Sequence, residues 1–219
     1  NITVFQGRNK VLDSFSLTID ESQSTVILGP NGSGKTTLLK LLNRELYIVE
    51  DPESSLKIFE KDKWNVDELR SNLGVVSQYL QYGYSKSAIG LYVVLSGFYS
   101  SDGIWQHQTF EDDKLNRAKE VMDLLSISDL QDRAFSSMST GEQRKFLLAR
   151  SLVNDPAVLV FDEPTSGLDM STCFQYLEII RELISMGKKV VLVTHHVHEI
   201  PPELTRVILL KEGKVIDDG

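Results

Sequence analysis

The chain has 219 residues, a length typical of one domain or of one domain with a subdomain. Hydrophobic residues make up 41% of the sequence and charged residues 25%, which excludes a globally disordered or fibrous protein. The 23 basic and 31 acidic residues give a net charge of −8. An acidic chain of this kind argues against binding to nucleic acids or anionic membranes, so we expect no nucleic-acid partner.

The sequence contains a single cysteine, Cys173. One thiol excludes an internal disulfide and a C-x-x-C motif, and favours a reducing compartment. The longest apolar stretch, 88–99, has 12 residues against the ~20 that a transmembrane helix needs. No secretory signal opens the chain, so we expect no direct membrane insertion.

The first 42 residues predict three strands and a helix. The strands are expected at 2–5, 11–19 and 24–28, because these segments are rich in β-branched and apolar residues. The third ends at Gly29 and Pro30, and 35–42 is composed of helix formers. Residues 24–42 are therefore interpreted as strand, glycine loop and helix.

The middle of the chain differs in character. Short strands are expected at 56–59 and 73–76, and 79–83 is aromatic and turn-rich. Helices are expected at 88–98 and 111–125, where apolar residues recur at helical spacing, with a loop at 100–103 between them. We interpret about 79–138 as a mostly helical insertion within one domain spanning 1–219.

The last third alternates between helices and strands. Helices are expected at 141–152 and 171–186, and strands at 157–161 and 189–193. Two further strands, 207–210 and 215–216, flank a hairpin turn at Glu212 and Gly213. Strands that alternate with helices predict an α/β fold with a largely parallel sheet covered on both faces.

The sequence GPNGSGKT at 29–36 matches the phosphate-loop pattern G-x-x-x-x-G-K-[ST] in full. Its glycines let backbone N–H groups converge on phosphate oxygens, and the following helix presents its positive end. Lys35 would neutralise the β- and γ-phosphates, and the Thr36 hydroxyl would bind Mg²⁺. A coincidental glycine turn would produce this pattern about once per hundred chains of this length. The predicted nucleotide-binding residues here are Gly29, Asn31, Gly32, Ser33, Gly34, Lys35, Thr36 and Thr37.

Two acids, Asp162 and Glu163, follow the apolar run at 158–161. The carboxyl ends of parallel strands meet at the edge of the sheet where α/β proteins bind ligands. Asp162 would hold Mg²⁺, and Glu163 would act as general base for the attacking water. The alternative is that both acids only cap the next turn, which the upstream phosphate loop disfavours.

Further motifs occur in the order found in one known family. The sequence MSTGEQR at 138–144 resembles the signature L-S-G-G-Q of the ATP-binding cassette (ABC) ATPases. Gln78 matches the Q-loop glutamine of that family, 166–169 its D-loop and His195 its switch histidine. Phe5 matches the aromatic residue that stacks on adenine. The matches cover essentially the whole chain.

The resemblance implies a P-loop NTPase core with a mostly parallel sheet flanked by helices, an N-terminal antiparallel β subdomain and a helical subdomain. It also implies that two cassettes pair head to tail around ATP. Ser139 and Gly141 would donate hydrogen bonds to the γ-phosphate held by the other chain. Gln78 would contact Mg²⁺ and the attacking water, His195 the γ-phosphate, and Asp169 would communicate across the dimer.

The signature departs from the family pattern at two positions. Thr140 replaces the first glycine and Glu142 replaces the glutamine. Thr140 is small enough to be tolerated. Glu142 adds a negative charge near the partner's nucleotide, so the resemblance leaves the strength of the closed dimer open.

Three functions are compatible with an ABC ATPase: the energy-coupling subunit of a membrane transporter, a machine of DNA repair or translation, and a regulatory module without turnover. The sequence has no heptad stretch for long coiled coils, which argues against a machine of DNA repair. It has only one cassette, which argues against a machine of translation. Lys35, Glu163 and His195 are all present, as a hydrolysing enzyme requires. We therefore expect an ATP- and Mg²⁺-dependent homodimer that is peripheral on the cytoplasmic face of the cell membrane and powers a separate permease. The solute and the direction of transport stay open.

Two groups of side chains allow other interpretations. His195, His196 and His198 resemble a metal cluster, but a strand end does not place all three on one face. Tyr79, Tyr82, Tyr84 and the segment 88–99 are candidates for a surface that receives the permease. The segment 88–99 is equally compatible with the core of the helical insertion.

Overall fold

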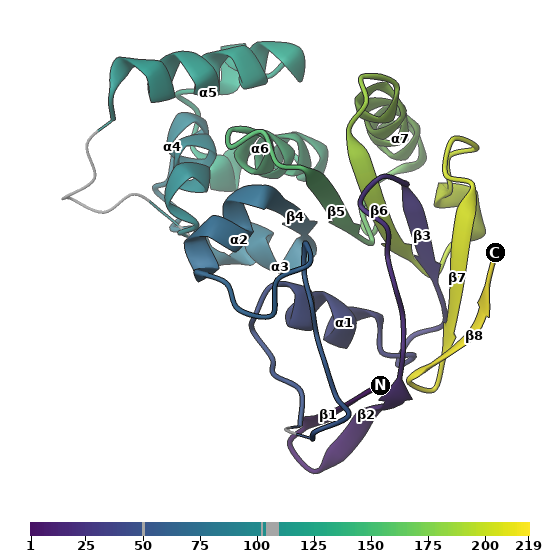
Figure 1. Cartoon of the computed structure of the whole chain (residues 1–219). Helices are drawn as coiled ribbons and strands as arrows, with labels where there is room; N and C mark the ends of the chain where they lie inside the picture. The colour runs from purple at the N-terminus through teal and green to yellow at the C-terminus, as the bar shows by residue number, and fades with distance from the viewer. Residues whose placement is uncertain (50, 102, 104–109) are drawn as a thin grey trace.

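The computed structural model describes residues 1–49, 51–101, 103 and 110–219, and its main element is a six-stranded sheet (Figure 1). The strand order is β4-β5-β6-β3-β7-β8, and only the pair of β7 and β8 is antiparallel. The strands are β3 (Thr25–Leu28), β4 (Leu73–Ser77), β5 (Val158–Asp162), β6 (Lys189–Thr194), β7 (Arg206–Lys211) and β8 (Lys214–Asp218).

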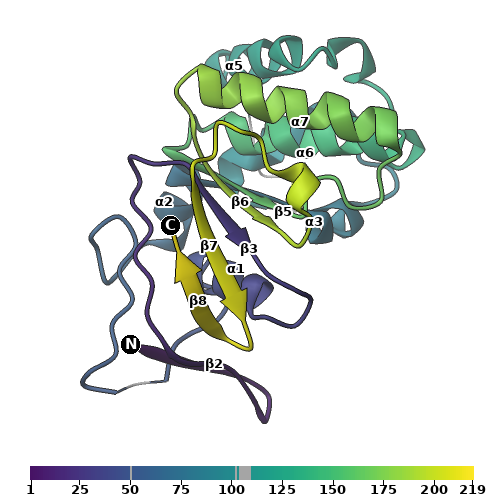
Figure 2. The same cartoon turned by 90° about the vertical axis from the view of Figure 1, so that its right-hand side faces the viewer.

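Helices cover both faces of this sheet, which explains why its inner strands are apolar throughout (Figures 1 and 2). One face is covered by α6 (Thr140–Leu152) and α7 (Met170–Ser185), and α4 (Gly90–Leu95) and α5 (Asp112–Leu124) pack on α6 and extend the same core. The opposite face packs against α1 (Lys35–Leu42). Successive residues alternate between the two cores, as Val26 and Ile27 do on β3. The predicted α/β fold with a mostly parallel, helix-flanked sheet is confirmed.

The N-terminal strands β1 (Ile2–Gln6) and β2 (Asn9–Phe15) form a separate antiparallel pair. Their inward side chains, including Val4 and Leu12, join the core on the α1 side of the large sheet. The predicted antiparallel β subdomain is therefore present, with β2 ending at Phe15 rather than at residue 19.

The strand expected at 56–59 is absent, and that prediction is wrong. Ile58 makes only an isolated bridge to Lys61. Phe59 and Glu60 adopt φ values of 48° and 62°, which reverse the chain within two residues. Trp64 fixes the turn, because its Nε1 donates to the Ile58 carbonyl at 2.7 Å. The turn at residues 59 and 60 therefore prevents a strand at 56–59, although the β propensity of this segment favours one.

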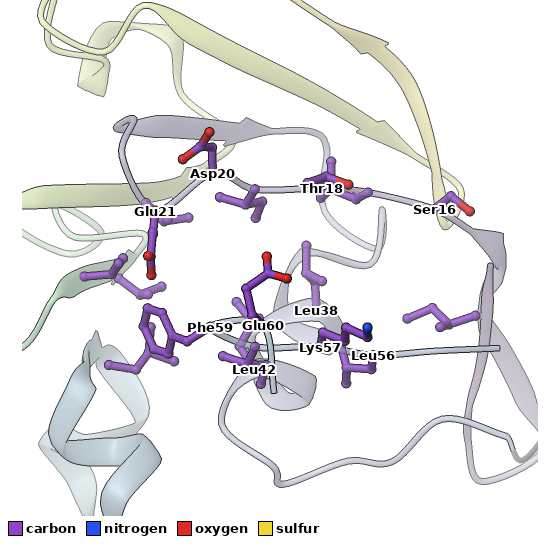
Figure 3. A pocket seen from close by; sticks show the side chains of 18 of the residues that line it. Ser16, Thr18, Asp20, Glu21, Leu38, Leu42, Leu56, Lys57, Phe59 and Glu60 are labelled. Atoms are coloured by element: carbon purple, nitrogen blue, oxygen red, sulfur yellow. The ribbon is translucent and has the colours of Figure 1, made fainter. Parts of the chain in front are cut away.

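The same turn lines a cavity of about 630 Å³ (Figure 3). Leu56 and Phe59 border it on one side, Leu38 and Leu42 of α1 on another, and the connection from β2 to β3 closes it. None of the predicted site residues lines this cavity.

The segment that follows β4 is mostly helical among its described residues. Residues 79–83, expected to be turn-rich, form most of α3 (Gln78–Gly83). The segment 88–98 forms α4 and η1 (Ser96–Tyr99), and Val93, Val94 and Leu95 are fully buried in the core. After α5 come η2 (Ser128–Leu130) and η3 (Phe135–Ser137). Residue 102 of the loop expected at 100–103, and residues 104–109, lie outside the described residues.

Helix α2 (Val66–Asn72) was not anticipated. Asn65 caps it, since its side chain accepts hydrogen bonds from the backbone N–H groups of Asp67 and Glu68. A last short helix, η4 (Val197–Glu199), follows β6. Among the described residues, every helix is too short or too polar to cross a membrane.

Candidate nucleotide-binding and hydrolysis site

Four adjacent parallel strands, β4, β5, β6 and β3, end together at one edge of the sheet. In their register Ser77 lies beside Asp162, and Leu28 lies beside Thr194. The loops that follow therefore leave the sheet from neighbouring positions, as is typical of ligand sites in α/β folds. The first residues of these loops are Gln78, Glu163, His195 and Gly29.

The phosphate loop connects β3 to α1 and requires glycine at defined positions. A Cβ on Gly29 would lie 2.3 Å from the Leu210 carbonyl oxygen. Gly34 caps α1 with a φ of 104°, a conformation that side chains with a Cβ rarely adopt. The Ser33 hydroxyl is buried without a hydrogen-bond partner among the described residues. A buried unpaired hydroxyl in such a loop suits an incoming phosphate oxygen.

The Lys35 side chain is buried inside the curve of this loop. Its Nζ donates to the carbonyl oxygens of Gly29 at 2.8 Å and Pro30 at 3.1 Å. The same ammonium lies 3.9 Å from Glu163 Oε1. Lys35 thus places a positive charge between the loop and the acid at the end of β5.

The two threonines in the first turn of α1 differ in exposure. Thr36 is exposed, whereas Thr37 is buried and accepts a hydrogen bond from Gln6 Nε2 at 3.2 Å. Phe5, the neighbour of Gln6, is 44% exposed and belongs to neither core. An aromatic ring left outside the core beside the phosphate loop is suited to stack on a base. Sequence reasoning missed Gln6, which only its place next to Phe5 could have indicated.

Glu163 and His195 meet directly, with 2.8 Å between Oε1 and Nδ1. Glu163 has a φ of 46°, in the left-handed region that is uncommon for side chains other than glycine. Its backbone N–H donates to the Val193 carbonyl at 2.8 Å, which ties the residue to β6. A carboxylate, an imidazole and an ammonium therefore converge on one point of the sheet edge.

Burial raises the pKa of Asp162 to about 6, and the negative charge of Glu163 contributes to this rise. Lys35 and Arg144 act in the opposite direction. Asp162, Thr36 and Gln78 together offer oxygen ligands at this edge. Mg²⁺ takes oxygen ligands and commonly binds one or two carboxylates plus substrate phosphates, so these residues fit it.

Gln78 begins α3 and points toward the loop after Glu163. A Cβ built on Gly167 would lie 4.0 Å from Gln78 Nε2. Gln81 of the same helix donates to Gln143 on α6. The segment that begins at Gln78 thus lies near the D-loop and is hydrogen-bonded to the signature helix.

The signature opens α6 with a capping box. The Ser139 hydroxyl accepts from the Glu142 backbone N–H at 3.3 Å, and Glu142 Oε2 accepts from the Ser139 N–H at 2.6 Å. The latter bond is the main reason why the pKa of Glu142 lies below its usual range. The acid that replaces the usual glutamine therefore stabilises the start of its own helix.

Among the described residues, no hydrogen bond or ion pair joins 139–142 to the phosphate loop of the same chain. Gly141 is instead buried against α7, whose N-cap is Asp169. The Asp169 carboxylate accepts from the Thr172 N–H at 3.1 Å and from the Thr172 hydroxyl at 2.6 Å. Ser139 is exposed to solvent.

Known proteins resemble this chain in sequence and in fold. The sequence model of the ABC transporter family matches residues 12–166. The chain belongs to the ABC transporter family. This cassette is 34% identical to the hemin import ATP-binding protein HmuV of Aliivibrio fischeri, over 100% of the chain and 82% of the relative. It is 30% identical to the arginine transport ATP-binding protein ArtP of Haemophilus influenzae, over 100% and 90%.

Solved structures agree with the fold. The dimeric structure of MJ0796, a bacterial ABC transporter cassette, matches with a TM-score of 0.79 and 26% identity, over 100% of this chain and 96% of that chain. The same cassette has also been solved in a post-hydrolysis state bound to ADP and Pi. This ABC cassette is accordingly an ATP-binding subunit of the ATPase class, as its motifs predicted.

Two buried polar residues near the site escaped sequence reasoning. Arg144 on α6 is fully buried and donates to the Ser166 carbonyl at 3.2 Å. Its Nε and Nη1 have no hydrogen-bond partner among the described residues. Glu199 is buried between two threonines, Thr165 and Thr194. Charged residues are usually exposed, so nothing in the local sequence indicates either position.

Proposed function

We propose that two copies of this cassette bind ATP and Mg²⁺ head to tail and use the hydrolysis to drive a solute through a separate membrane permease. The contact of Glu163 with His195, beside Lys35 and the phosphate loop, carries the proposal. The names of the relatives HmuV and ArtP, an import and a transport ATP-binding protein, support the coupling to transport.

In this account the phosphate loop holds the nucleotide. Phe5 stacks on the adenine, the backbone of 29–34 binds phosphate oxygens, and Lys35 exchanges its carbonyl partners for the β- and γ-phosphates. Thr36, Asp162 and Gln78 hold Mg²⁺, which neutralises charge on the phosphate oxygens when it is bound.

The chemical step requires a base and a stabilising donor. Glu163 takes a proton from water as the water oxygen attacks the γ-phosphorus, and the bond to the bridging oxygen breaks to leave ADP and inorganic phosphate. His195 binds the γ-phosphate while charge redistributes over its oxygens. The hydrogen bond between the two side chains, in which Glu163 Oε1 lies 3.9 Å from the Lys35 ammonium, supports a shared role at the γ-phosphate.

The second copy supplies the signature. Ser139 and Gly141 begin α6, and its N-terminus presents N–H groups suited to a phosphate. Their separation from the chain's own loop supports a role toward the partner's ATP. The dimer of MJ0796 shows that a related cassette pairs with a second copy.

The permease is expected to dock beside α3 and α4. Tyr79 and Tyr82 on α3 are 82% and 75% exposed, and Tyr92 on α4 is also exposed. Exposed aromatic side chains are enriched where proteins bind partners. Because Gln78 starts the same helix, docking here would reach the nucleotide site directly. The cassette would then act on the cytoplasmic face of the cell membrane.

Sedimentation velocity of the Glu163→Gln chain tests the dimer. With ATP and Mg²⁺ the variant is expected to sediment as a dimer, because it binds ATP without consuming it. The Lys35→Ala chain should stay monomeric under the same conditions. A Glu163→Gln chain that binds ATP but remains monomeric at every protein concentration would contradict the paired site.

A further inference from the structure

Glu199 is the most deeply buried acid near the site, with 1% of its surface exposed. It is the last residue of η4 and lies four residues after His195. It does not belong to the predicted site residues. Removing a carboxylate from water costs several kcal/mol unless hydrogen bonds replace the lost solvation. The partners of Glu199 therefore indicate what the residue contributes.

Each carboxylate oxygen of Glu199 accepts a hydrogen bond from a different buried threonine. The Thr165 hydroxyl donates to Oε1, and the Thr194 hydroxyl donates to Oε2. Both threonines are themselves buried. Within the part of the chain that the structure describes, Glu199 forms no salt bridge. The hydrogen bonds of the carboxylate thus come from two hydroxyl groups, one in the loop after β5 and one at the last residue of β6.

The same two chain segments carry the residues proposed to perform hydrolysis. Thr165 follows Glu163 by two positions, and Thr194 directly precedes His195. The Thr194 hydroxyl also accepts from the His196 backbone N–H at 3.0 Å. The hydroxyl that binds Glu199 therefore holds the backbone on both sides of His195. One carboxylate therefore links the chain segments on which the Glu163–His195 contact depends.

The backbone of Glu163 gives this link a physical role. The left-handed region is unfavourable for a non-glycine residue, and the conformation persists only where its surroundings enforce it. Glu163, with a φ of 46°, is held on one side by its N–H bond to Val193. On the other side the Glu163 carbonyl accepts from the Ser166 N–H at 3.1 Å, which closes a turn around Thr165, and the bond of Thr165 to Glu199 ties that turn to the buried carboxylate.

We propose that Glu199 is a positioning residue for ATP hydrolysis: it fixes the carboxylate of Glu163 relative to the imidazole of His195 by binding Thr165 and Thr194 together. The inference rests on the proposed roles of Glu163 and His195. Among the described residues Glu199 makes no hydrogen bond to the phosphate loop, and the loop reaches the link only through the Gly29 N–H, which donates to the backbone carbonyl of Thr194 at 3.3 Å. Removing a side chain of the link leaves that backbone bond in place, so the link acts on turnover and leaves nucleotide binding intact.

Steady-state ATP hydrolysis by four purified variants tests the proposal. Glu199→Ala and the isosteric Thr194→Val each remove hydrogen bonds of the link, and should lower kcat by about 10–100-fold while KM for ATP changes less than about threefold. Glu199→Gln should retain most of kcat, because its amide can accept from one threonine and donate to the other. Glu203→Ala, an exposed acid paired with Arg181, is the matched control and should leave kcat unchanged.

Melting temperature and ATP binding are measured for each variant, so that loss of folding is recognised. If Glu199→Ala does not fold, the kcat of Thr194→Val tests the proposal instead. A folded variant that lacks the link and keeps wild-type kcat overturns the proposal, as does a Glu199→Gln chain that is folded but as slow as the alanine variant. Glu163→Gln in the same assay separates the two accounts: if it still hydrolyses ATP, the proposed function fails whatever Glu199 does.

Discussion

Gly141 on the signature helix and Thr172 on α7 approach so closely that only glycine fits between them. A Cβ at position 141 would lie 2.4 Å from Thr172 Cγ2, while the other Thr172 side-chain atoms would be at 3.7 and 3.8 Å. Thr172 cannot swing away easily, because its N–H and hydroxyl both donate to Asp169. The contact therefore fixes the signature helix against the D-loop.

Gly141→Ala should weaken this packing although alanine favours helices. Overpacking of this kind costs about 1–3 kcal/mol, so we expect a lower melting temperature and weaker ATP-dependent dimerisation. The double variant Gly141→Ala/Thr172→Ser removes Cγ2 but keeps the hydroxyl, and should restore both. Calorimetry and sedimentation velocity provide the comparison. A double variant as impaired as the single one would show that the clash is not with Thr172.

Glu163→Gln should lower ATP turnover by about 10²–10⁴-fold while ATP affinity stays near the wild-type value. The amide keeps the shape of the side chain and its contact with His195 but cannot take a proton from water. Turnover and nucleotide affinity are measured on the same protein. Turnover close to wild type would exclude Glu163 as the base.

Lys35→Ala should abolish tight ATP binding, because the ammonium inside the phosphate loop is the charge proposed to meet the β- and γ-phosphates. Lys40→Ala, on the same helix, is the matched control and should bind ATP normally. Isothermal titration gives both affinities. Unchanged affinity in the Lys35 variant would contradict the phosphate-loop assignment.

Asp162→Asn should stabilise the chain measured without nucleotide or Mg²⁺. The folded pKa of about 6 exceeds the usual 3.8, so the folded state binds a proton more tightly than the unfolded state. The free energy of unfolding therefore falls as pH rises from about 4 to 6 and stays lower above it. At pH 7 asparagine removes this cost, of about 1–3 kcal/mol, and at pH 4 the gain should vanish.

Asp155 provides a control of opposite sign. Its bond with Lys188 holds its pKa below the usual value, so its charge favours the folded state at pH 7. Asp155→Asn should therefore lower the melting temperature at pH 7, where Asp162→Asn raises it. If both substitutions shift stability in the same direction at pH 7, burial of charge does not explain the behaviour of Asp162.

Local patterns sufficed for the core of the site. The phosphate loop and the acids after β5 are each specified by neighbours within a few positions, so spacing alone predicts them. Ser139 was predicted through the resemblance of 138–144 to the family signature. The parallel sheet then follows from apolar runs that alternate with helices. The register of the sheet explains why residues as distant in sequence as Leu28 and Thr194 lie side by side.

Other features depend on contacts that the local sequence does not encode. The run at 56–59 has the composition of a strand, but a strand also requires a partner, and the turn at Phe59 leaves it with a single bridge. Glu199 lies 34 residues from Thr165, and its burial follows from the packing of two loops. Such buried polar residues become visible only when the tertiary structure is known.

Capture of membrane partners tests the transport account most directly. A tagged Glu163→Gln chain, with ATP and Mg²⁺, is recovered from detergent-solubilised membranes of the cells that encode it, with Lys35→Ala as the parallel control. The account predicts that one protein with several membrane spans is enriched with the Glu163→Gln chain and not with the control. Enrichment of ribosomes, DNA or soluble proteins alone would contradict transport and leave only the ATPase chemistry.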